Sequence, residues 1–158
     1  MAEAEKSPAP GSADPALHVL YERWAESMRG GRLPSARDMD VGALMEDHPG
    51  AALITVEPRG DGARRYVYSE VGPAHRAALG RDIRGYSIDE LVAPQQVAYF
   101  ESIYDKIVAE ARPHYWMRMN TIFGSDLHTF ERLIVPVADD GQNVDGLVGI
   151  WVWFDERR

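Results

Sequence analysis

The chain has 158 residues, 45% of them hydrophobic, which is enough for one domain with a single core. Its formal net charge is −8, and acidic residues lie among the arginines of 59–84. Because phosphate binding needs a basic surface, we expect no nucleic-acid partner. The absence of cysteine excludes disulfides, thiolate catalysis, Cys-ligated metals and Cys-based photochemistry.

The N-terminal region predicts a tail and one amphipathic helix. Residues 1–13 contain Pro, Ala, Ser and Gly and no large apolar side chain after Met1, which favours a disordered tail. Over 14–31, Asp14 and Pro15 form a typical helix start and two glycines form a stop. The apolar stripe of this helix consists of Leu17, Leu20, Tyr21, Trp24 and Met28. It either packs on the body of the domain or forms a dimer interface.

The segment 32–49 reads as a connector in which Asp40 caps a short helix, and 50–158 as the main domain. The main domain begins with strands at 51–56 and 65–71, which predict a hairpin. Short helices and loops follow up to Leu91, with Ser87 and Glu90 spaced as a capping box. A longer helix then runs from Pro94 to Ala111.

Three consecutive strands end the chain, at 113–123, 127–137 and 146–154, separated by two turns. The last strand is apolar almost throughout, so both of its faces should be covered and it should lie inside the sheet. The order of elements predicts an α+β fold. It has a five-stranded antiparallel sheet with helices on one face, plus the N-terminal amphipathic helix.

The turn at Gly124 and Ser125 predicts the pairing of the two strands that it joins. A two-residue turn places Arg118 opposite Glu131 and Met119 opposite Phe130. This register assigns five side chains to an apolar face, with Arg132 among them: Tyr115, Met117, Met119, Phe130 and Ile134. A buried arginine without a partner is costly. Arg132 therefore either reaches solvent at the rim or holds an anionic ligand such as a carboxylate.

In this order of elements the sequence resembles a PAS domain, and among these the short stand-alone bacterial PAS-like proteins. The similarity rests, in chain order, on Leu20, Tyr21 and Trp24; Arg32 to Ser35 with Asp38 and Asp40; Gly80 to Gly85; Ile88 to Leu91; Glu131 to Val137; and Asp140 with Gly141. The resemblance implies the sheet order second, first, fifth, fourth, third strand. It also implies a sensory module that holds a small ligand between the sheet and the long helix, often as a dimer.

The candidate ligand pocket consists of Tyr68, Tyr104, Met117, Met119, Phe130, Arg132 and Ile134. Trp116 could join it, although aromatic side chains at these positions could equally serve packing alone. We expect no cofactor, because flavin and chromophore adducts of PAS sensors need a cysteine and haem commonly needs a histidine on the long helix. The five histidines fit no metal-ligand spacing, and no catalytic motif is present.

The favoured function is a sensory or regulatory PAS-type module that is not an enzyme and lacks its own output domain. It would bind a small molecule or signal through a partner protein or its own homodimer. The alternative is a ligand-free dimerisation module. A cone-shaped α+β isomerase or dehydratase is a third hypothesis, disfavoured because two strands precede the main helix. With no signal segment and no apolar run of ~20 residues, we expect a cytoplasmic protein without membrane contact.

Overall fold

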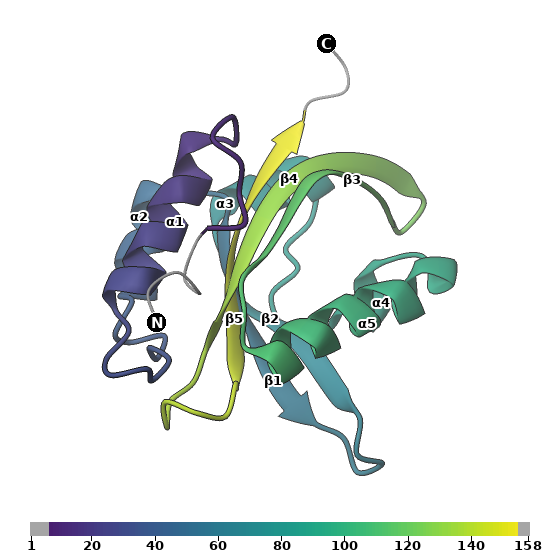
Figure 1. The fold of residues 1–158 in the computed structure, drawn as a ribbon. Coiled ribbons are helices and arrows are strands. Elements are labelled where there is room, and N and C mark those ends of the chain that lie inside the picture. Colours follow the sequence, from purple (N-terminus) through teal and green to yellow (C-terminus); the bar gives the residue numbers. More distant parts are fainter. Residues whose placement is uncertain (1–6, 155–158) are drawn as a thin grey trace.

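One antiparallel sheet separates two hydrophobic layers in the computed structural model, which describes residues 7–154 (Figure 1). The described helices are α1 (Pro15–Glu26), α2 (Val41–Asp47), α3 (Pro73–Leu79), α4 (Ile88–Leu91) and α5 (Pro94–Glu110). The strands are β1 (Ala51–Pro58), β2 (Arg64–Val71), β3 (His114–Phe123), β4 (Asp126–Val137) and β5 (Gly146–Phe154). Their order in the sheet, β2-β1-β5-β4-β3, is the predicted one.

The central strand is β5, as its apolar sequence predicts. It pairs with β1 on one side and β4 on the other, and Gly146 to Trp151 are buried. A side chain at Gly149 would meet the Trp151 ring at 2.6 Å, so this glycine leaves room for a large ring on the same strand.

We call the face of the sheet covered by α4 and α5 the inner face (Figure 1). Phe100, Tyr104 and Ile107 of α5 are buried against it, because they recur at the three-to-four-residue spacing of one helix face. At the start of α4, the Glu90 carboxylate accepts a hydrogen bond from the Ser87 N–H at 2.9 Å, as the predicted capping box requires.

The outer face, opposite, is covered by α1 and α2 of the same chain (Figure 1). Helices thus cover both faces of the sheet. Leu17, Leu20, Tyr21 and Trp24 are buried, and the Trp24 indole donates a hydrogen bond to the Pro136 carbonyl at 2.8 Å. The interpretation that the α1 stripe packs on the domain therefore holds. These four side chains are buried within the chain, whereas Met28, the fifth residue of the stripe, is partly buried.

The N-terminal boundaries differ from the prediction in two places. Residues 7–13 of the expected disordered tail lie on the outer layer, where the small side chains of Ala9 and Ala13 are buried; residues 1–6 lie outside the described part of the chain. The α1 helix ends at Glu26 rather than near residue 31. Beyond it the chain reverses through a short bridge between Arg29 and Arg32.

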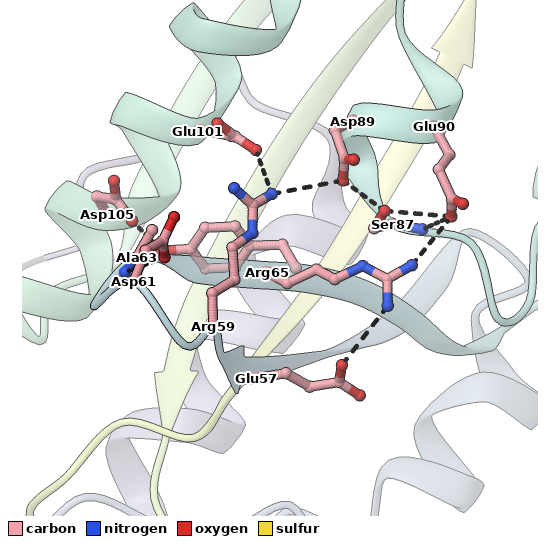
Figure 2. Close-up of polar contacts among 11 residues, drawn as sticks. Glu57, Arg59, Asp61, Ala63, Arg65, Ser87, Asp89, Glu90, Glu101 and Asp105 are labelled. Carbon is pink, nitrogen blue, oxygen red and sulfur yellow. Dashed lines mark hydrogen bonds and ion pairs between the residues drawn. The ribbon is translucent and has the colours of Figure 1, made fainter.

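Ion pairs attach the β1–β2 hairpin to α4 and α5 (Figure 2). Arg59 lies 3.3 Å from Glu101, and Arg65 lies 3.3 Å from Glu90. Partly exposed pairs of this kind contribute less than ~1 kcal/mol each, so they add little to the stability of the fold.

A β-bulge in β3 changes the predicted register. Met119 does face Phe130, but the pairing shifts between Trp116 and Met119, so Trp116 rather than Met117 reaches the inner face. The predicted pair of Arg118 with Glu131 is therefore wrong. Arg118 lies over the Phe154 ring, and Glu131 accepts a hydrogen bond from the Tyr115 hydroxyl on the outer face at 2.6 Å.

No helix among residues 7–154 combines the length and the apolar character needed to cross a bilayer.

Candidate ligand site

Arg132 is a fully buried cation on the inner face of β4. Its side chain has 0% exposure, so the alternative that it reaches solvent at the rim is wrong. Nη2 donates a hydrogen bond to Nδ1 of His114 at 3.1 Å, whereas Nε and Nη1 have no hydrogen-bond partner. A guanidinium carries five N–H donors and no acceptor, so most of its hydrogen-bonding capacity is unused.

Aromatic rings enclose this guanidinium in place of a carboxylate. Its Cζ lies 5.1 Å from the centre of the Trp116 ring and 5.9 Å from that of Tyr104. None of the ion pairs among the described residues includes Arg132. Burial lowers the pKa of Arg132 from its usual value, while the nearby Tyr104 and Tyr68 hydroxyls act in the opposite direction. An arginine in a protein nevertheless stays protonated, so the site holds an uncompensated positive charge.

The hydroxyls of Tyr68 and Tyr104 form a buried pair 3.2 Å apart on the same side of the sheet. Burial raises the pKa of both, so both phenols are neutral at physiological pH. One hydroxyl proton serves the hydrogen bond between them, and the second has no acceptor within that pair.

His114 completes the polar group as an acceptor. Burial, together with the charges of Arg132 and Lys106, lowers the pKa of His114 from 6.5 to about 4. The ring is therefore neutral at pH 7, and Nδ1 accepts the hydrogen bond from Arg132.

Known structures share the fold of this chain, although no family model and no curated protein matches the sequence. The PAS domain of BvgS from Bordetella pertussis superposes with a TM-score of 0.52 and 16% identity, over 73% of this chain and 84% of that one. A light-oxygen-voltage (LOV) domain studied with a flavin analogue superposes with a TM-score of 0.51 and 14% identity, over 73% of this chain and 84% of that one. The LOV protein of Rhodobacter sphaeroides superposes with a TM-score of 0.50 and 12% identity, over 89% of this chain and 70% of that one. The chain has the PAS fold.

In this PAS fold, six of the seven predicted pocket residues are buried on the inner face: Tyr68, Tyr104, Met119, Phe130, Arg132 and Ile134. The exception is Met117, which is 59% exposed because it lies in the β3 bulge. Sequence reasoning included Trp116 only as a possible member and missed His114. Without the bulge, both would point to the outer face, and nothing in the sequence marks the bulge.

Open space in this PAS fold lies elsewhere. A surface pocket of about 500 Å³ lies between α3 and the end of β5, lined among others by Pro49, Ala78 and Trp153. Two smaller pockets have volumes of about 220 and 240 Å³. None of the three contains a predicted pocket residue. A ligand therefore reaches Arg132 only if side chains above it move.

The residues above Arg132 lie at the junction of α5 and β3. Tyr99 of α5 is exposed, and its ring lies 5.7 Å from that of the partly exposed Trp116. The Trp116 ring also contacts those of Phe100 and His114. Trp116 thus links the exposed Tyr99 ring to the buried guanidinium, whose Cζ lies 5.1 Å from the centre of the Trp116 ring.

The described residues contain no group of three or more His, Asp or Glu placed to hold a metal ion.

Proposed function

We propose that this chain is a PAS-type sensory or regulatory module that binds a small ligand between the inner face and α5, with Arg132 as the centre of recognition. The observation that carries the proposal is a fully buried guanidinium with two unpartnered nitrogens and no acidic partner among the described residues. The other five buried residues of the predicted pocket belong to the hydrophobic layer on the same face of the sheet.

The energetic argument favours a binding role for Arg132 over a structural one. Burial of a charge without a counter-charge costs several kcal/mol, and an apolar side chain of similar volume would stabilise a core at least as well. Stacking of the guanidinium on aromatic rings offsets only ~0.5–2 kcal/mol of this cost. A ligand that brings a negative charge would offset the remainder.

The strand that carries Arg132 offers a route for a signal to the outer layer. The preceding residue, Glu131, points to the outer face and accepts hydrogen bonds from the Tyr115 hydroxyl and from the backbone N–H of Asp14. Asp14 caps α1. A displacement of β4 on ligand binding would therefore be passed to α1, which could present the change to a partner protein or to a second copy of the chain.

The light-oxygen-voltage neighbours do not extend the proposal to flavin photochemistry, because the sequence has no cysteine to form a flavin adduct. Nor does α5 carry a histidine that could serve as a haem ligand.

A thermal-shift screen with metabolite fractions and a small-molecule library tests the proposal. A ligand at 100 times its Kd stabilises the folded state by about 2.7 kcal/mol, which is a readily measured rise in Tm. At least one compound should produce it. If no compound shifts the Tm while light scattering shows a dimer, the chain is instead a ligand-free interaction module.

A further inference from the structure

We infer that the ligand is a small monocarboxylate, bound by the Arg132 guanidinium and by the free hydroxyl proton of the Tyr68–Tyr104 pair. This inference rests on the proposed function and adds the chemical class of the ligand.

The first argument is a surplus of hydrogen-bond donors in a buried site. Arg132 supplies five N–H groups, of which Nη2 serves His114, while Nε and Nη1 remain unpartnered. Tyr68 and Tyr104 supply two O–H groups, of which their mutual contact uses one. Free hydrogen-bond donors next to a positive charge suit a negatively charged group that accepts hydrogen bonds and donates none. A carboxylate is such a group.

The second argument concerns the number of charges. Among residues 7–154, Arg132 is the buried cation of the inner face, and the polar groups around it, His114 and the two tyrosines, are neutral. One guanidinium balances one negative charge. A phosphate dianion or a dicarboxylate would leave a second charge uncompensated in an apolar layer, which is costly.

The third argument concerns the part of the ligand next to the carboxylate. Tyr104 and Trp116 form the walls nearest the guanidinium, and the Phe100 ring contacts both of them at 6.2–6.4 Å between centroids. Walls of this kind suit an apolar or aromatic group, because they offer ring faces and edges and few polar atoms.

Calorimetric titration with a panel of matched pairs tests the inference. The panel pairs acetate, butyrate, phenylacetate and indole-3-acetate each with its primary amide, which has nearly the same shape but no charge. The proteins are the wild type, Arg132→Met, and Arg118→Met as a control that removes an exposed arginine from neighbouring β3. Inorganic phosphate is an additional probe.

At least one carboxylate should bind the wild type at least 10-fold more tightly than its amide, and phosphate should not bind. Arg132→Met should lose this preference while Arg118→Met keeps it. Circular dichroism establishes that each variant is folded, and the comparison of acid with amide on the wild type needs no variant.

Two results overturn the inference. Equal affinity for acid and amide, retained in Arg132→Met, would mean a neutral ligand and would leave the proposed function intact. Absence of binding by every carboxylate would also overturn it, and the proposed function would fail as well only if the broader thermal-shift screen gave no ligand.

Discussion

At the scale of single residues, Arg132 is the position where stability and the proposed function oppose each other. Its neighbours in the core are apolar, and its charge is balanced by no acidic group among the described residues. A side chain selected for packing alone would be apolar. The proposed binding of an anion would account for a guanidinium at this position.

Without ligand, Arg132→Met should leave the free energy of unfolding unchanged or raise it by ~1–4 kcal/mol, because it replaces an uncompensated buried charge by an apolar side chain of similar length. Urea denaturation measures this quantity, with Arg118→Met as the exposed control. A loss of 3 kcal/mol or more in Arg132→Met alone would show that the guanidinium serves structure.

A glycine immediately before β1 lets two backbones lie close together. A Cβ at Gly50 would lie 2.1 Å from the carbonyl oxygen of Trp151, whose N–H donates to the Gly50 carbonyl at 2.9 Å. Since the clashing atom belongs to the backbone of the central strand, it cannot rotate away.

Gly50→Ala should therefore lower the free energy of unfolding by about 1–3 kcal/mol, because β1 must shift from β5. Gly60→Ala, at a position with no atom within 4 Å of the added Cβ, is the matched control and should change it by less than ~0.5 kcal/mol. Denaturant titration measures the stability of the two variants. Equal stabilities would contradict the close approach of the Gly50 and Trp151 backbones.

At the scale of elements, α1 is held on the outer face by apolar contacts and one buried hydrogen bond. Trp24→Phe keeps most of the ring but leaves the Pro136 carbonyl without the indole donor, so it should cost ~1–3 kcal/mol. Urea denaturation measures the loss, with Tyr86→Phe at an exposed ring as the control. If Trp24→Phe is no less stable than the control, α1 does not depend on this bond.

Sequence patterns predicted the elements well and the site less completely. The apolar run of β5 identified the central strand, and the caps at Asp14, Asp40 and Ser87 placed three helix starts. These signals are local, so a single sequence contains them. Partners far apart along the chain, such as Glu131 with the Asp14 N–H, have no local signal.

The register of β3 shows why the site was incomplete. Counting from the turn at Gly124 is valid as far as Met119, and beyond it one bulge moves every side chain to the other face. Met117 therefore left the predicted site, and Trp116 and His114 entered it. A bulge depends on the fit between strands, which alternation of apolar and polar residues does not encode.

At the scale of the whole molecule, two histidines make stability depend on pH. Burial lowers the pKa of His75 and of His114 from 6.5 to about 4. Between these values the unfolded chain binds more protons than the folded one. The free energy of unfolding therefore has its full value above pH 6.5 and decreases progressively as the pH falls toward 4.

The free energy of unfolding should fall steadily when urea denaturation is repeated from pH 7 to pH 4.5. Asp82 and Asp140, whose pKa values are lowered to about 2, act at lower pH, and Asp145, whose pKa burial raises, acts in the opposite direction. Constant stability down to pH 4.5 would mean that His75 and His114 titrate normally and are not buried as described.

The most direct test of the binding role of Arg132 is NMR observation of its Nε–H signal, assigned by its loss in Arg132→Met. On titration with the tightest-binding carboxylate of the panel, this signal should shift in proportion to the bound fraction, while the signal of Arg118 stays in place. An unchanged Arg132 signal in the presence of bound carboxylate would contradict the assignment of this residue as the anion-binding group.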